Sequence, residues 1–257
     1  MNPLPPRVDA VLFDKDGTLI DSLGPWAEAE SLICRAIVDG HPAAPENLGK
    51  RSAAVTEALA AVGVAGGAVD PNGILATSGG DANLDALRRS LSTSLGGPLG
   101  CLSDPSSFAL EFSRILHALY PLGMQPFRPM PGAGEALRAL SEAGIPLGLA
   151  TSDDRRMSLR QLEAFGWKER FAFMAFGDTA PRRKPDPWMA QEFSRVLKVD
   201  LSRIAVIGDT PADYGMARSA GVRLFVKVAG SIEGLAPFLL GSAIGEEAAF
   251  AAMDFPA

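Results

Sequence analysis

The amino-acid sequence predicts an α/β protein with a doubly wound parallel sheet and an inserted α-helical domain. Three observations favour this fold class: short apolar runs that end in polar residues, helical patterns that alternate with them, and one long interruption. The apolar runs are Val8–Phe13, Ile145–Ala150 and Ile204–Gly208, and helical patterns cover Gly134–Gly144 and Pro187–Val199. We expect residues 1–21 and 128–257 to form the core domain and residues 22–127 to form a domain of their own.

The first apolar run leads directly into two carboxylates, in the sequence Asp14-Lys15-Asp16-Gly17-Thr18. In an open parallel sheet, ligands bind beyond the carboxyl ends of the strands, where Asp14 and Asp16 would lie. Gly17 would let the chain turn sharply after the strand. The alternative is a polar turn without function, because Asp and Gly are ordinary turn residues.

The last apolar run also delivers acidic residues, Asp209 and Asp213, to its carboxyl end. Two strands therefore present carboxylates at the same edge of the predicted sheet. The alternative is that both residues only cap the helix that begins near Pro211.

Two weaker signals lie between these runs. Thr151 and Ser152 follow the run Ile145–Ala150, and their hydroxyls could serve a ligand or cap a helix. Lys184 stands beside Pro185 just before a predicted helix, and a solvated basic loop is its alternative explanation.

In this order and combination, the four motifs resemble the haloacid dehalogenase superfamily, specifically its magnesium-dependent phosphatase branch. The resemblance spans residues 8–213. It implies a Rossmann-like core with the active site at the carboxyl edge of the central strands. The segment Asp16–Ser22, which reads Asp-Gly-Thr-Leu-Ile-Asp-Ser, is also similar to phosphoglycolate phosphatases, so phosphoglycolate is a candidate substrate.

The expected substrate requires a cation at this site. A phosphate monoester is a dianion, which bare carboxylates would repel unless a divalent metal ion lay between them. Oxygen ligands favour Mg²⁺. We expect Asp14 and Asp209 to bind the metal through their side chains, and the resemblance adds the backbone carbonyl of Asp16. Asp213 would act through a bound water or by orienting the other ligands.

Four residues are the predicted catalytic residues. Asp14 would attack phosphorus and form an aspartyl-phosphate. Asp16 would protonate the leaving alkoxide and then activate the hydrolytic water. Thr151 would donate a hydrogen bond and Lys184 a positive charge to the phosphoryl oxygens, and Ser152 is a further candidate for substrate binding.

The inserted domain resembles the helical cap domain of this superfamily. Its predicted helices are Trp26–Val38, Arg51–Val62, Ala82–Leu95 and Ser106–Tyr120. The glycine-rich segment Gly63–Gly80 predicts an irregular connection. Lys50 and Arg51 are candidates for binding a second anionic group of the substrate, with a solvated helix start as the alternative.

Lys15 and the C-terminal tail each allow more than one interpretation. Lys15 stands where many relatives carry an apolar residue, and it either adds positive charge near the phosphate or faces solvent. The tail Ser231–Ala257 has an apolar helical pattern that could cover the core or a partner subunit, and the oligomeric state is open.

The presence of Asp16 helps to distinguish among the other activities of the superfamily. Dehalogenases need neither this second aspartate nor a metal, and phosphonoacetaldehyde hydrolases replace it, so both activities are disfavoured. Sugar phosphomutases keep both aspartates and are an alternative. A catalytically silent binding protein on the same fold is another alternative.

Composition narrows the expected partners and location. The chain has 257 residues, 47% of them hydrophobic, and a net charge of -6. An acidic protein is a poor candidate for binding a nucleic-acid polymer, so we expect a small-molecule phosphate ester. The first residues do not read as a signal peptide and no run has membrane-spanning length, which predicts a cytoplasmic protein without a membrane partner.

Overall fold

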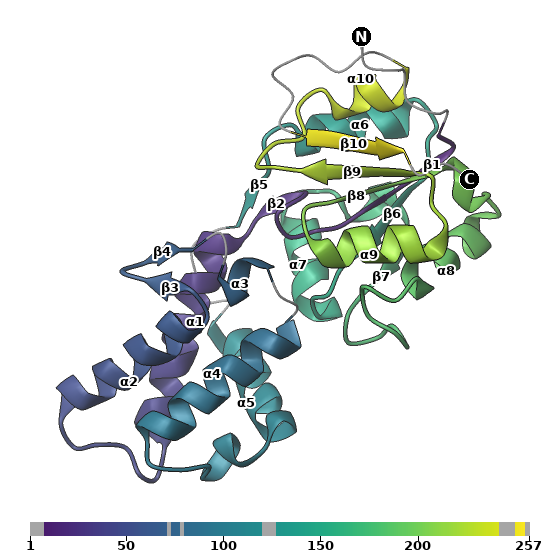
Figure 1. Ribbon diagram of the computed structural model, residues 1–257. Helices are drawn as coiled ribbons and strands as arrows, with labels where there is room; N and C mark the ends of the chain where they lie inside the picture. The colour runs from purple at the N-terminus through teal and green to yellow at the C-terminus, as the bar shows by residue number, and fades with distance from the viewer. Residues whose placement is uncertain (1–7, 71–72, 78–79, 120–126, 242–249, 255–257) are drawn as a thin grey trace. The chain divides into compact units, whose positions relative to one another are not determined.

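The computed structural model describes residues 8–70, 73–77, 80–119, 127–241 and 250–254 (Figure 1). The chain divides into two compact units, one formed by residues 1–21 and 127–257 and the other by residues 22–126. We call the first the sheet unit and the second the helical unit. Within the described ranges, no helix is both long and apolar enough to cross a membrane.

A six-stranded sheet forms the centre of the sheet unit. Its order is β10-β9-β8-β1-β6-β7, and all neighbours are parallel except β10 and β9. The strands are β1 (Ala10–Phe13), β6 (Leu147–Ala150), β7 (Phe171–Ala175), β8 (Ile204–Gly208), β9 (Leu224–Val228) and β10 (Phe250–Asp254). Every residue of β1 is fully buried because helices cover both faces of the sheet. The predicted doubly wound α/β fold is confirmed.

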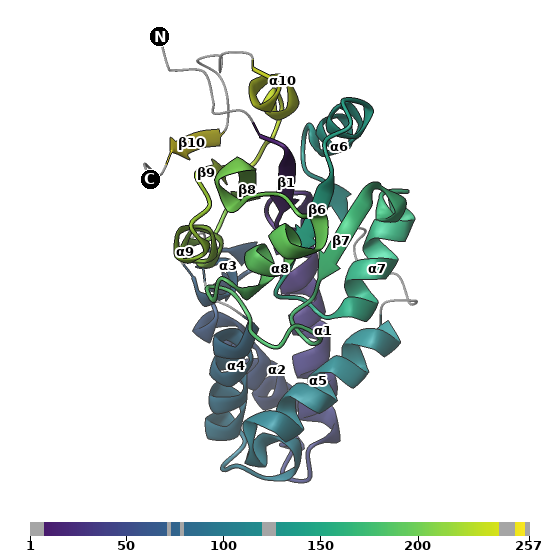
Figure 2. The same cartoon turned by 90° about the vertical axis from the view of Figure 1, so that its right-hand side faces the viewer.

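The helices of this unit lie on the two sides of the sheet (Figure 2). On one face, Phe193 of α8 and Met216 of α9 join the apolar cluster of Leu12 and Val206. Helices α6 and α10 lie on the other side and contact each other. The helices are α6 (Ala133–Glu142), α7 (Arg155–Ala164), α8 (Trp188–Leu197), α9 (Pro211–Ala220) and α10 (Leu235–Leu239), with 3-10 turns at Lys168–Arg170 and Leu201–Arg203.

The C-terminal tail differs from the helical pattern expected for Ser231–Ala257. Its described residues form the short helix α10 and the strand β10, which pairs antiparallel with β9. In this register Met253 lies opposite Phe225. An edge strand offers unpaired backbone groups, and their pairing with the tail overrides the local helical pattern.

Most described residues of the helical unit lie in helices. They are α1 (Leu23–Gly40), α2 (Leu48–Ala61), α3 (Ile74–Thr77), α4 (Gly80–Ser94) and α5 (Pro105–Leu119), with a 3-10 turn at Gly100–Ser103. Helix α2 begins three residues earlier than predicted because the Asn47 side chain accepts hydrogen bonds from the backbone N–H groups of Gly49 and Lys50.

The segment Gly63–Gly80 is more regular than its glycine content predicts. It contains the hairpin β3 (Val64–Ala65) and β4 (Ala68–Val69), followed by α3. Gly66 and Gly67 have φ of 58° and 82°, the backbone conformation that a two-residue hairpin turn requires. The glycines therefore specify a turn here.

Strand β2 (Ile20–Asp21) pairs antiparallel with β5 (Arg128–Pro129) where the chain leaves and re-enters the sheet unit.

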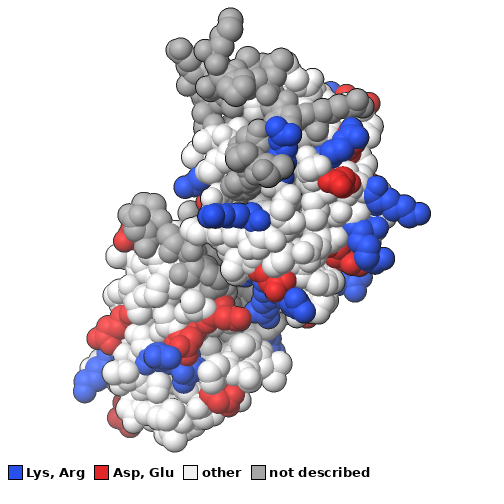
Figure 3. Space-filling model, turned by 45° about the vertical axis from the view of Figure 1, so that its right-hand side comes forward, with Lys and Arg blue, Asp and Glu red and all other residues white. Residues whose placement is uncertain are grey.

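On the face drawn in Figure 3, acidic and basic side chains are intermingled. This mixture is typical of a solvated surface.

Candidate active site

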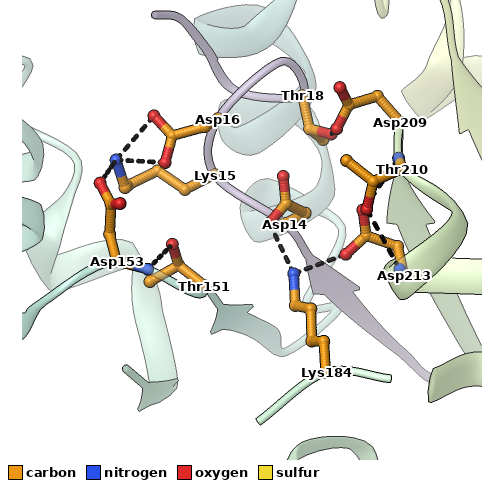
Figure 4. Close-up of polar contacts among 10 residues, drawn as sticks. All are labelled: Asp14, Lys15, Asp16, Thr18, Thr151, Asp153, Lys184, Asp209, Thr210 and Asp213. Carbon is orange, nitrogen blue, oxygen red and sulfur yellow. Dashed lines mark hydrogen bonds and ion pairs between the residues drawn. The ribbon is translucent and has the colours of Figure 1, made fainter. Parts of the chain in front are cut away.

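Three polar residues lie side by side at the carboxyl edge of the sheet. Asp209, Asp14 and Thr151 each follow the last residue of β8, β1 and β6, which are neighbours in the sheet. The backbone N–H of Asp14 donates to the carbonyl of Ile207 at 2.8 Å, which continues the pairing of β1 with β8 up to the site. Adjacent parallel strands thus bring together residues from three distant parts of the sequence (Figure 4).

Lys184 reaches this edge from the loop before α8. Its ammonium lies 2.5 Å from Asp14 Oδ1 and 2.5 Å from Asp213 Oδ1, and its side chain is 2% exposed. Burial disfavours its charge, but the two carboxylates outweigh that cost and raise the pKa of Lys184 above its ordinary value. The solvated-loop alternative for Lys184 is therefore wrong.

Asp213 serves both the helix and the site. Thr210 is the N-cap of α9, and its backbone N–H and hydroxyl donate to Asp213 Oδ2 at 3.1 and 2.6 Å. The Asp213 N–H donates back to the Thr210 hydroxyl, which completes a capping box. Since Oδ1 contacts Lys184, both carboxylate oxygens of Asp213 are engaged. Asp213 thus holds both the N-cap residue of α9 and the Lys184 ammonium, and its role behind the metal ligands stays a prediction.

Gly17 makes room for Asp209. It has φ of 77°, and a Cβ atom at this position would lie within 2.1 Å of Asp209 Oδ2. The next residue, Thr18, is fully buried, and its hydroxyl donates to Asp209 Oδ1 at 3.4 Å. The turn after β1 thus needs glycine for both its conformation and its closeness to Asp209.

The carboxylates at this edge repel one another. Oxygens of Asp14, Asp209 and Asp213 all lie within 4.8 Å of one another. Burial and the charge of Asp213 raise the pKa of Asp14 well above its ordinary value, against the opposing charge of Lys184. The same two causes raise the pKa of Asp209 to about 7. One lysine does not balance these three carboxylates, of which Asp14 and Asp213 are buried and Asp209 is half-buried, so a further cation would stabilise the cluster.

A hard divalent cation fits this donor set. All three side chains offer oxygen, the ligand type that Mg²⁺ prefers. Asp14 and Asp209 are the side chains best placed to hold the ion, because both Asp213 oxygens already have protein partners.

Thr151 and Ser152 differ in their surroundings. Thr151 is buried, and its hydroxyl oxygen accepts a hydrogen bond from the Asp153 N–H at 3.1 Å. A hydroxyl that accepts can also donate, so Thr151 keeps the donor that phosphate binding would use. Ser152 is exposed. A substrate contact by either residue stays a prediction.

Lys15 does not face solvent, which was one of its two alternatives. Its side chain is fully buried and contacts Asp16, Asp153 and Gln161. Asp153 directly follows Thr151 and Ser152 in the sequence, whereas no motif includes Gln161 of α7. Asp153 and Gln161 belong to the segment after β6, far from Lys15 in the sequence, so these two contacts could not be read from the residues around Lys15.

Lys50 and Arg51 lie in the first turn of α2 in the helical unit. Lys50 is exposed. Arg51 donates to the carbonyl of Pro45 at 2.6 Å and pairs with Asp39 at 3.0 Å, so its guanidinium supports the local loop. Their contact with a substrate stays a prediction.

Comparison with known proteins identifies the family. The model of the haloacid dehalogenase-like hydrolases matches residues 8–221. A phosphoglycolate phosphatase of Mesorhizobium japonicum is 37% identical over 95 residues, which cover 37% of this chain and 42% of that protein. Another, from Nitrosospira multiformis, is 25% identical over 232 residues, which cover 90% of this chain and 87% of that protein. Several matches, the first among them, thus span only about half or less of the relative's length.

The fold agrees with a solved structure. A predicted phosphoglycolate phosphatase from Haemophilus somnus superposes with a TM-score of 0.64 at 21% identity, covering 87% of this chain and 86% of the other. At this identity the likeness concerns the fold alone. With the motifs gathered at one sheet edge and the family model matching most of its length, the chain belongs to the haloacid dehalogenase-like hydrolase family.

Proposed function

We propose that this protein is a Mg²⁺-dependent phosphatase that hydrolyses a small-molecule phosphate monoester through an aspartyl-phosphate on Asp14. The observation that carries the proposal is the placement of Asp14. It lies at the end of the central strand, touches the Lys184 ammonium and belongs to the cluster of three carboxylates. A nucleophilic carboxylate beside a cation-binding site is the arrangement that phosphoryl transfer needs.

In the first step, an Asp14 oxygen attacks phosphorus and the bond to the leaving alkoxide breaks. Asp16 supplies the proton that the alkoxide takes up. Lys184, which contacts Asp14, would reduce the negative charge that an approaching dianion meets. The Thr151 hydroxyl would donate a hydrogen bond to a phosphoryl oxygen. Bound Mg²⁺ would neutralise charge on the phosphoryl oxygens.

In the second step, water attacks the phosphorus of the aspartyl-phosphate. Asp16, now a carboxylate, accepts the proton of this water, and the bond between phosphorus and the Asp14 oxygen breaks to release phosphate. Both steps use one acid–base residue, so they restore the enzyme to its starting state.

Phosphoglycolate is the first substrate to test, because the matched relatives bear the name phosphoglycolate phosphatase. Its carboxylate would be the second anionic group for which Lys50 and Arg51 are candidates. A sugar phosphomutase would use the same core residues and transfer the phosphoryl group to a second sugar phosphate instead of water.

The test is phosphate release from phosphoglycolate, sugar phosphates and nucleotides, with Mg²⁺ and then with a chelator. We expect release only with Mg²⁺, concentrated on one class of ester. Transfer to an added sugar phosphate in place of release would favour the mutase, and no turnover with any ester would favour a binding protein.

The nucleophile is tested by Asp14→Asn. We expect no turnover and an unchanged or higher melting temperature, because the variant removes one of three carboxylates that repel one another. Asp200→Asn is the matched control, since Asp200 is exposed and the new side-chain oxygen can still accept from Ser202. Turnover by Asp14→Asn at the wild-type rate would contradict the role of Asp14.

A further inference from the structure

Lys15 lies between the two aspartates of the first motif, and its side chain is fully buried. A buried ammonium is costly unless its donors are paired with acceptors. The partners of Lys15 therefore show what this charge does in the fold. They are all in the sheet unit.

The ammonium joins Asp16 to residues that follow β6. Nζ lies 2.8 Å from Asp16 Oδ1 and 2.7 Å from Asp16 Oδ2. It donates to Gln161 Oε1 at 2.7 Å and lies 2.9 Å from Asp153 Oδ2. An ammonium has three donors, and here three side chains surround it.

These contacts turn Asp16 away from the carboxylate cluster. In Figure 4 the Asp16 carboxylate points toward Lys15 and Asp153, whereas Asp14 contacts Lys184 on the other side of the loop. Because both Asp16 oxygens face the same ammonium, rotation toward Asp14 breaks charge-assisted contacts.

We propose that Lys15 is a positioning residue that, with Asp153 and Gln161, forms a latch holding Asp16 away from the reacting phosphoryl group. Asp16 must leave this latch to protonate a leaving alkoxide. The latch therefore slows steps that depend on Asp16, most strongly for alkyl phosphates, whose poor leaving groups need a proton. This consequence rests on the proposed acid role of Asp16, whereas the orientation of Asp16 does not.

Two variants separate positioning from charge. The double variant Lys15→Met/Asp153→Asn removes one positive and one negative charge, so the net charge of Lys15, Asp16 and Asp153 stays at -1 while the latch is lost. Asp153→Asn alone removes the competing carboxylate and leaves Lys15 bound more firmly to Asp16. Lys227→Met is the control, because Lys227 is exposed on β9.

The experiment compares kcat/KM for an alkyl and an aryl phosphate. We expect the alkyl-to-aryl ratio to fall about threefold to tenfold in Asp153→Asn and to rise by a similar factor in the double variant. The control should keep the wild-type ratio. A ratio that is unchanged in both variants, or that falls in the double variant, would overturn the latch. If the double variant does not fold, the alkyl-to-aryl ratio of Asp153→Asn alone tests the latch. A fall supports the latch, and an unchanged ratio overturns it.

Crystal structures of the two variants decide the same point without activity. The latch predicts that Asp16 stays against Lys15 in Asp153→Asn and turns toward Asp14 in the double variant. An Asp16 carboxylate still turned away in the double variant would overturn it. Failure of the proposed phosphatase activity would appear separately, as a wild-type protein that hydrolyses no ester.

Discussion

Replacing Glu30 by glutamine should stabilise the helical unit above neutral pH. Glu30 of α1 is 1% exposed, and its Oε1 accepts a hydrogen bond from Asn83 Nδ2 at 2.5 Å. Within the described part of the chain, Glu30 Oε2 and Asn83 Oδ1 are buried and have no hydrogen-bond partner. Burial of these acceptors without a donor favours the protonated form of Glu30, and the glutamine of the variant is neutral and carries a permanent N–H donor.

The size of the effect follows from the pKa of Glu30. Burial raises this pKa from 4.5 to about 7, against the opposing hydrogen bond from Asn83. Between these values the folded protein holds a proton that the unfolded chain has lost, so stability falls as pH rises from about 4.5 to about 7. Relative to a pH well below 4.5, the raised pKa of Glu30 therefore lowers the free energy of unfolding by about 1 kcal/mol at pH 5 and by about 3 kcal/mol at pH 8.

The assay is urea unfolding of wild type and Glu30→Gln at pH 5 and pH 8. We expect the variant to gain about 3 kcal/mol at pH 8 and about 1 kcal/mol at pH 5. Glu46→Gln is the control, because Glu46 is exposed in the same unit and its change should alter stability little at either pH. A gain that is equal at both pH values, or a loss at pH 8, would refute the reasoning.

Two further variants test the site. Gly17→Ala should lower both activity and stability, because its Cβ would strike Asp209; the control Gly144→Ala has a similar φ of 73° with open space around it and should cost only about 1–2 kcal/mol without loss of activity. Equal activities of the two variants would contradict the close contact. Thr210→Val removes the hydroxyl that pairs with Asp213, so we expect a loss of about 1 kcal/mol in urea unfolding together with a lower kcat. An unchanged kcat would show that the Thr210 hydroxyl stabilises the start of α9 but does not contribute to catalysis.

The strands that position the site were predictable because their signals are local. β1, β6 and β8 lie within the three apolar runs, and the residue after each strand is the polar residue that the motif supplies. A strand that is buried on both faces of a parallel sheet requires a continuous apolar run, so the first polar residue marks the end of the strand. The closeness of Asp14 and Asp209 then follows from the adjacency of β1 and β8.

Contacts between distant segments were not predictable in this way. The burial of Lys15 depends on Gln161, which lies 146 residues further along the chain. The tail joins the sheet because β9 offers a free edge, although its own pattern is helical. Nothing in a local pattern reports an acceptor or an edge that another segment provides.

The sequence by itself determined the α/β fold class, the family and the residues that meet at the sheet edge, because periodicity and motif order are properties of neighbouring residues. Only the tertiary structure decided the partners of the charged groups: Lys184 between Asp14 and Asp213, and Lys15 against Asp16. A buried charge is stable only where the fold supplies an opposite charge or a hydrogen-bond partner, and that supply depends on packing rather than on sequence spacing.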